Sequence, residues 1–132
     1  MRVDRHKDKL MKESKMKFVL LVYQGTTPLP GSESWNAMSH EEQKAVYTEY
    51  AELHKTPGFT PGLPLGLPNA ARTVQVKDGK INVREGTHLQ EGAGGYFVFE
   101  ADDIDAAVVL AARVPAARLG GAIEIRPAEQ YW

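Results

Sequence analysis

Residues 94–127 read GGYFVFEADDIDAAVVLAARVPAARLGGAIEIRP and encode a strand, a helix and a second strand in succession. The run 96–99 is aromatic and β-branched and follows two glycines, which is typical of a strand. Further on, Gly120 and Gly121 turn the chain, and residues 122–126 alternate between apolar and polar as a half-buried strand does. These residues predict a βαβ unit around which the rest of the chain can be arranged.

The helix of this unit is indicated by its start and stop signals. Asp102 is expected to be the N-cap, and Asp103 and Asp105 place negative charge in the first turn, where the helix dipole favours it. Small apolar residues and good helix formers fill residues 106–112. Pro115 limits how far the helix can extend.

Length and composition set the class of protein. The 132 residues predict one domain, and 42% apolar with 25% charged residues is typical of a globular chain. The net charge of −1 provides no basic field for nucleic acid, and the absence of cysteine excludes disulfides and thiolate catalysis. No apolar run approaches the roughly 20 residues of a membrane span. We therefore expect a cytoplasmic protein that binds neither nucleic acid nor membranes.

Residues 1–15 differ from the rest of the chain in composition. They contain six basic and three acidic residues and few apolar ones. Two interpretations are open: an arm that binds nucleic acid, or a disordered leader. We expect the leader, because the globular pattern begins at residues 16–18 without it, and we place the domain at residues 16–132.

A homodimer is predicted from two strands that are apolar on both faces. These are residues 18–23, FVLLVY, and residues 96–99. A strand with one wet face would alternate instead. Burying each such side chain contributes about 1.5–3 kcal/mol, and a chain of this length has few residues left to cover a second sheet face. We therefore expect a second copy of the chain to cover that face.

The region between these strands begins with a predicted loop and a predicted helix. Residues 24–38 are rich in Gly, Pro, Thr and Ser and predict a loop, in which Trp35 is either a lid over the core or a ligand-stacking residue. Ser39 and Glu42 form a capping box that starts a helix, which we expect to end near Lys55.

A short edge strand and a hairpin are expected next. The proline-rich segment 57–68 predicts turns around an edge strand at residues 59–65, because proline lacks the N–H that a central strand needs. The alternative is that the segment lines a groove. Asp78 and Gly79 lie between alternating runs and predict a β-hairpin from Thr73 to Val83.

Several of these segments together resemble the YCII-related family, in the subgroup of DGPF-domain proteins. The matching segments are KFVLLVY at 17–23, TPGLPLGLP at 60–68, VKDGK at 76–80 and the block at 94–127. The resemblance covers residues 16–132. It implies an α+β fold, namely a ferredoxin-like βαββαβ domain with the hairpin as an insertion, which pairs as a dimeric α+β barrel.

The chain departs from this subgroup at the motif that gives it its name. Members read T-D-G-P-F, whereas residues 84–88 of this chain read REGTH, so the DGPF motif is degenerate. In related members a histidine on the first helix and an acidic residue are proposed as a dyad. The resemblance puts Tyr47 near the position of that histidine, so the dyad is not intact in this chain, and Tyr47 is a candidate ligand-binding residue only.

The catalytic candidates are Glu85 and His88, in the polar loop 84–93. Their spacing allows an acid–base pair, and the open alternative is a solvated loop histidine. The four histidines, at 6, 40, 54 and 88, lack the spacing of metal ligands, so we expect no metal and no cofactor.

Two further ligand-binding candidates come from the residues themselves. Tyr23 ends the first strand, where its hydroxyl either serves a ligand or reaches water. Arg118 either binds a carboxylate bidentately, forms a structural ion pair with Glu100 or Asp102, or caps helix carbonyls.

Three functions are compatible with these observations. We favour a homodimeric small-molecule-binding protein whose ligand lies between the sheet and the first helix. The second is a cofactor-free lyase or isomerase in which Glu85 or His88 moves a proton and Tyr23 or Arg118 holds the substrate. The third is a regulatory or interaction protein linked to transcription.

Overall fold

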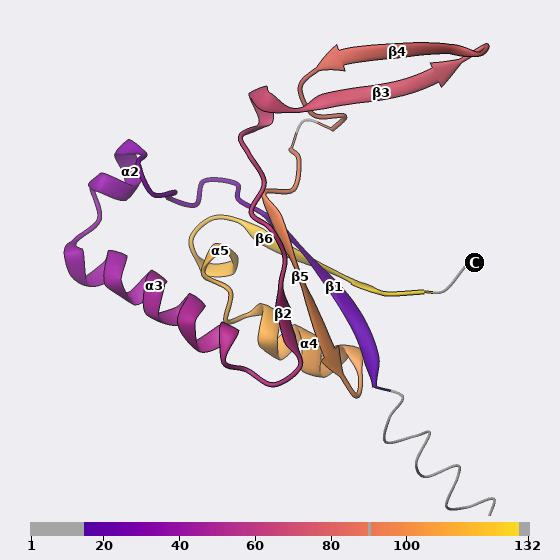
Figure 1. Cartoon of the computed structure of the whole chain (residues 1–132). Helices are drawn as coiled ribbons and strands as arrows, with labels where there is room; N and C mark the ends of the chain where they lie inside the picture. Colours follow the sequence, from indigo (N-terminus) through magenta and orange to yellow (C-terminus); the bar gives the residue numbers. More distant parts are fainter. Residues whose placement is uncertain (1–14, 90, 130–132) are drawn as a thin grey trace, which may run out of the picture.

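The computed structural model describes residues 15–89 and 91–129, which form a mixed α+β fold with two antiparallel sheets (Figure 1). In chain order the elements are β1 (Met16–Tyr23), α2 (Glu33–Asn36), α3 (His40–His54), β2 (Phe59–Pro61), the 3-10 helix η1 (Pro68–Ala70), β3 (Arg72–Lys77), β4 (Lys80–Glu85), β5 (Gly95–Ala101), α4 (Ile104–Ala111), α5 (Pro115–Arg118) and β6 (Ala122–Pro127). Apart from Lys15, the predicted leader lies outside the described residues. Within those residues, no helix has the length and apolar character needed to cross a bilayer.

The larger sheet has the strand order β2-β5-β1-β6. The central strand β1 pairs antiparallel with β5 on one side and β6 on the other. This register puts Phe18 opposite Phe99 and Leu20 opposite Phe97. The predicted strand–helix–strand unit is confirmed as β5, α4 and β6, and its two strands flank β1.

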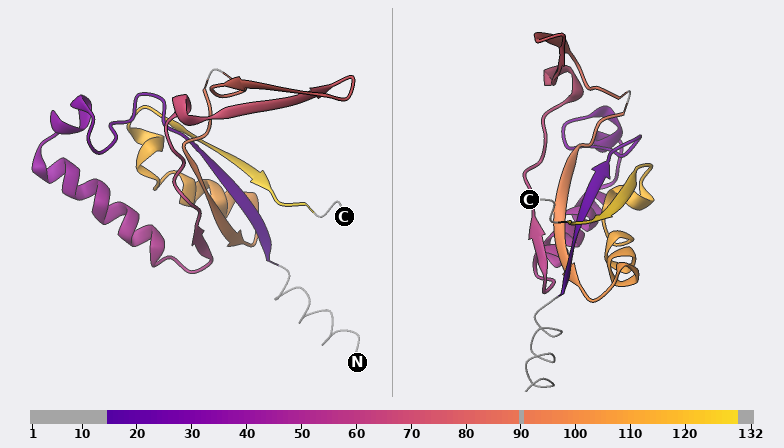
Figure 2. Two further views of the ribbon diagram at one scale, coloured as in Figure 1. Left: turned by 45° about the horizontal axis from the view of Figure 1, so that its top comes forward. Right: turned by 90° about the vertical axis from the view of Figure 1, so that its right-hand side faces the viewer.

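The core lies between one face of this sheet and the helices α3, α4 and α5 (Figure 2). Alternate residues of β1, namely Phe18, Leu20 and Val22, point to that face and are buried. Leu53 of α3 and Leu110 of α4 cover them. The capping box is also confirmed, since the Ser39 hydroxyl accepts a hydrogen bond from the Glu42 backbone N–H at 3.1 Å.

Two helix starts differ from the prediction. The N-cap of α4 is Asp103 rather than Asp102: its Oδ1 accepts from the Ala106 backbone N–H at 2.9 Å. The predicted loop 24–38 contains the short helix α2, because the Ser32 hydroxyl accepts from the Trp35 backbone N–H at 3.2 Å. Trp35 is buried, as expected of a lid.

The predicted edge strand 59–65 is present in part. Only Phe59–Pro61 has strand geometry, as β2, beside β5. Beyond it the segment still follows β5, since Gly62 N–H donates to the Tyr96 carbonyl and Leu65 N–H to the Gly94 carbonyl, both at 3.0 Å. Prolines in the segment interrupt the ladder because they have no N–H to donate.

The predicted hairpin is confirmed as β3 and β4, and it extends away from the larger sheet (Figure 1). Its two faces differ in character, because strand residues alternate. One face, here called the hairpin face, carries four apolar side chains that are 59–71% exposed. They are Val74, Val76, Ile81 and Val83.

The second face of the larger sheet has no helix over it among the described residues (Figure 2). We call it the open face. Its centre is apolar and half-exposed, and polar side chains lie around that centre, among them an ion pair between Lys17 and Glu100 at 3.8 Å. The apolar residues are Val19, Leu21, Tyr23, Tyr96 and Val98.

Candidate functional site

Two adjoining cavities form one groove at the end of the larger sheet. A narrow chamber of about 250 Å³ lies between α3 and the sheet. A wide chamber of about 750 Å³ lies between the loop after β1, the proline-rich segment and the loop before β5. Both are lined by Gln24, Pro64 and Gly94, so the two chambers adjoin at these residues.

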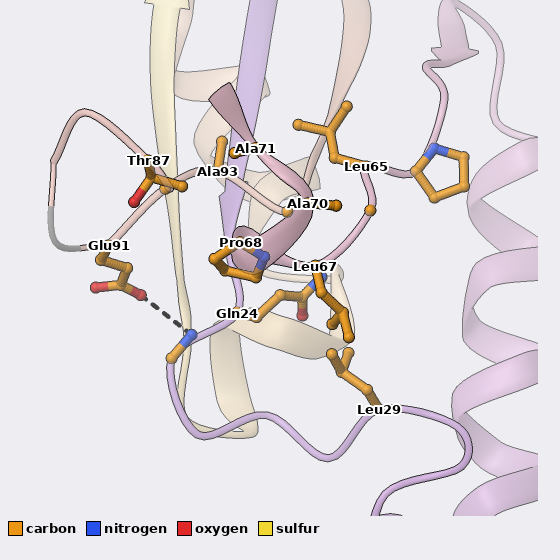
Figure 3. Close-up of a pocket in the computed structure, with 15 residues that line it drawn as sticks. Gln24, Leu29, Leu65, Leu67, Pro68, Ala70, Ala71, Thr87, Glu91 and Ala93 are labelled. Atoms are coloured by element: carbon orange, nitrogen blue, oxygen red, sulfur yellow. Dashed lines mark hydrogen bonds between the residues drawn. The ribbon is translucent and has the colours of Figure 1, made fainter. Parts of the chain in front are cut away.

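The wide chamber is mostly apolar, with the polar side chains of Glu91 and Thr87 on one side (Figure 3). Glu91 lies on one side, Leu29, Leu65 and Leu67 lie on the other, and Gln24 lies between them. Prolines and alanines of the proline-rich segment and η1 fill out the wall. A surface of this kind suits a ligand with one polar end and an apolar body.

The polar side of the wide chamber is held by a contact between two loops. The Gly25 backbone N–H donates to Glu91 Oε1 at 3.1 Å. Gly25 has φ +54°, and a Cβ on it would lie 2.2 Å from the Gly120 carbonyl oxygen, so only glycine fits here. Thr26 N–H donates to that same carbonyl at 3.2 Å. The loop is therefore fixed to the turn before β6.

The junction of the two chambers is formed by Gln24 and Gly94. Gly94 N–H donates to the Val22 carbonyl at 2.7 Å, which brings the two strand ends together. A Cβ on Gly94 would lie 2.7 Å from Gln24 Cγ and 2.9 Å from its Nε2. The Gln24 side chain thus lies directly against the glycine backbone, with its amide available at the junction.

The narrow chamber receives Tyr50 and His54 from one face of α3, since residues four apart lie one turn from each other. The Tyr50 ring packs on Phe97 with centroids 6.5 Å apart, and the His54 ring meets Phe59 edge-on at 5.7 Å. Burial, and then the Glu49 carboxylate, raises the pKa of Tyr50 above its usual 10.0. Its hydroxyl is therefore neutral and can both donate and accept.

The catalytic candidates Glu85 and His88 have separate partners. Glu85 Oε1 lies 3.7 Å from Arg72 Nη2 across the hairpin, and its side chain is 83% exposed. The Arg84 guanidinium lies 3.5 Å from His88 Nδ1 and donates to the His88 carbonyl at 2.9 Å. Neighbouring strand residues point to opposite faces, so Glu85 faces away from Arg84. Neither candidate lines the groove, whereas Thr87 between them does.

The ligand-binding candidates Tyr23, Tyr47 and Arg118 lie outside the groove lining as well. Tyr23 belongs to the open face, because its neighbour Val22 points into the core. Tyr47 is exposed and meets Trp35 edge-on at 5.5 Å. Arg118 donates to Glu49 of α3.

The expected pairing of Arg118 with Glu100 or Asp102 is therefore wrong. Glu100 pairs with Lys17 instead. The short helix α5 directs Arg118 toward α3, a contact that residue spacing could not reveal.

Sequence reasoning did not select the groove residues Gln24, Tyr50, His54 and Glu91. The signals for them are the i, i+4 spacing of Tyr50 and His54 in the predicted helix and the position of Glu91 in the same polar loop as Glu85 and His88. In residues 15–89 and 91–129, no group of three or more His, Asp or Glu side chains is arranged to hold a metal ion.

The chain matches the family model of the YCII-related domain over residues 16–130. This range takes in every element from β1 to β6, and with them the groove and the hairpin. No curated protein matches the chain.

Proposed function

The chain belongs to the YCII-related family, and we propose that it is a homodimeric protein that binds a small molecule in the groove. The observation that carries this proposal is the pair of adjoining chambers between the sheet, α3 and the proline-rich segment. A chamber of about 750 Å³ is within the usual range of ligand sites.

The lining supports binding of this kind. Ligand sites are mostly apolar with a few convergent polar groups that fix orientation. Here Gln24, Tyr50, His54 and Glu91 provide such groups from three different segments. The apolar area of the wide chamber can then contact the body of the ligand.

The proposal includes the finer fold assignment. Without the hairpin and the short helices, the element order is β1, α3, β2, β5, α4, β6, which is the βαββαβ order of a ferredoxin-like domain. We place the chain in the DGPF subgroup on the segments at 17–23, 60–68, 76–80 and 94–127.

A second copy of the chain is the proposed cover for the open face and the hairpin face. Both are apolar, and large exposed apolar patches mark interaction sites. The open face also carries charges of both signs beside its apolar centre, Lys17 with Glu100 and Arg126 with Glu124. A two-fold interface can oppose such charges, because each copy contributes the same patch.

The binding proposal is tested with Nile red, an uncharged probe whose fluorescence rises in apolar sites. Ala70 lines the wide chamber, so Ala70→Trp should fill it and lower the fluorescence. Ala51→Trp on the exposed surface of α3 is the matched control. If both variants and the unaltered chain bind Nile red equally, the probe binds outside the groove, and the groove is rejected as the binding site.

A cofactor-free lyase or isomerase is the second candidate function. It requires Glu85 or His88 to act on a substrate near Thr87, at the rim of the wide chamber. Its support is weaker, because Glu85 is paired with Arg72 and both candidates are exposed. Turnover of small carboxylates or lactones that is lost in Glu85→Ala and His88→Ala would favour it. No contact among the described residues supports the third function, a regulatory or interaction protein linked to transcription.

A further inference from the structure

We infer that the groove selects its ligand by charge: it prefers an elongated molecule with an apolar body and a cationic or neutral polar end to one that ends in a carboxylate. The polar end is received by Glu91 and the body by the leucines across the wide chamber. This inference rests on the proposed function and adds the ligand class to it.

The charges of the lining support this selection. The described residues that line the wide chamber include one charged side chain, Glu91, and neither lysine nor arginine. The narrow chamber adds His54 and the neutral Tyr50 hydroxyl, again without lysine or arginine. A ligand carboxylate in the wide chamber would meet Glu91 with no fixed cation to pair with, whereas an amine would meet an opposite charge.

Two hairpin arginines lie beside the chamber without lining it, since Arg72 donates to the Ala71 carbonyl at 2.9 Å and Arg84 is held by the loop after β4. Arg84 donates to the Thr87 carbonyl at 3.0 Å and to the His88 carbonyl at 2.9 Å. These bonds fix the guanidinium against the loop backbone. Arg84 is not part of the chamber lining, so it does not offset the charge of Glu91 there.

Glu91 has the capacity to bind a ligand while it holds the loop. An ionised carboxylate has about four acceptor sites on two oxygens. The Gly25 N–H uses one site on Oε1 and fixes the orientation of the group. The remaining sites can accept from an ammonium or hydroxyl group of the ligand.

The direction of the bound molecule follows from the placement of the wall residues. Glu91 and the leucines Leu29, Leu65 and Leu67 lie on opposite sides, with the Gln24 amide between them (Figure 3). A ligand with its polar end at Glu91 therefore directs its apolar body past Gln24 onto the leucines.

The test compares three probes with the same tail: octylamine, octanol and octanoate, each used to displace Nile red. We expect octylamine to bind about three- to fivefold more tightly than octanoate, the range of an exposed ion pair, with octanol between them. Glu91→Gln should remove the difference between octylamine and octanoate. Glu52→Gln, an exposed carboxylate on α3 outside the lining, should leave it unchanged.

A second measurement needs no variant. Raising NaCl from about 0.1 M to about 1 M shortens the Debye length from about 10 to about 3 Å, so the octylamine preference should shrink. Octanoate binding as tight as octylamine, or a preference that survives Glu91→Gln, overturns the charge selection and leaves groove binding intact. Failure of all three probes to displace Nile red overturns the proposed function itself.

Discussion

Arg118 in α5 donates a hydrogen bond to the carboxylate of Glu49 in α3, a residue 69 positions earlier in the chain. The two side chains are 49% and 32% exposed. The pair fixes α3 beside α5, and α3 contributes Tyr50 and His54 to the narrow chamber. Glu49 also acts on its neighbour Tyr50, whose pKa it helps to raise.

A double-mutant cycle with Arg118→Met and Glu49→Gln should give a coupling energy of about 0.5–1 kcal/mol in urea unfolding, because the pair is partly exposed. The pair Arg126–Glu124 on β6, at 3.8 Å and more exposed, is the control and should give less. Equal coupling in the two cycles would contradict a special role for the helix–helix pair.

Because of Tyr50, the free energy of unfolding should fall at alkaline pH. Its folded pKa is raised, first by burial and then by Glu49, so the folded state favours the neutral phenol. The stabilisation is fully present below the unfolded pKa of 10.0 and is lost as pH rises through the folded pKa. The free energy of unfolding of Tyr50→Phe should therefore fall less than that of the unaltered chain above pH 10. Parallel curves for the two proteins would show that Tyr50 ionises freely when folded.

Gly25→Ala should destabilise the chain more than Gly31→Ala. Both glycines have positive φ, which costs an alanine roughly 1–2 kcal/mol. At Gly31 a Cβ meets nothing within 4 Å, whereas at Gly25 it would lie 2.2 Å from the Gly120 carbonyl oxygen. The extra loss at Gly25, measured as a larger drop in melting temperature, reports the close packing of the two loops. Equal drops in melting temperature for the two variants would mean that the loop moves away from the Gly120 carbonyl with no loss of stability.

The hairpin face should contribute to self-association. We expect Val76→Lys or Ile81→Lys to lower the mass measured by sedimentation from dimer toward monomer, because each places a charge in an apolar contact. Gln75→Lys lies on the opposite face of the same strand and should leave the mass unchanged. A monomeric unaltered chain would reject the dimer. A dimer that tolerates Val76→Lys and Ile81→Lys would assign the interface to the open face alone.

Much of the fold could be predicted from local patterns. The apolar strand 18–23, the Ser39–Glu42 capping box and the Asp78–Gly79 hairpin all express preferences that act between near neighbours in the chain. Errors arose where two adjacent residues offered the same chemistry. Asp102 and Asp103 are both good N-caps, and backbone geometry at the end of β5 selected Asp103.

The candidate site could be predicted far less well. Glu85 and His88 are close in sequence, and the structure gives them different arginine partners at the base of the hairpin. Gln24 and Glu91 are far apart in sequence, and both line the wide chamber because β1 and β5 pair and bring their connecting loops together.

The sequence by itself determined the order of the main strands and helices, the Ser39–Glu42 capping box, the Asp78–Gly79 turn, and a first strand that is apolar on both faces. These properties depend on dihedral preferences and on side-chain periodicity, which are local. Only the tertiary structure decided that Arg118 pairs with Glu49 and that Glu91 meets Gly25, because strand register and helix packing set which distant residues become neighbours. A ligand site is built from such distant neighbours, and so it appears only when the chain is folded.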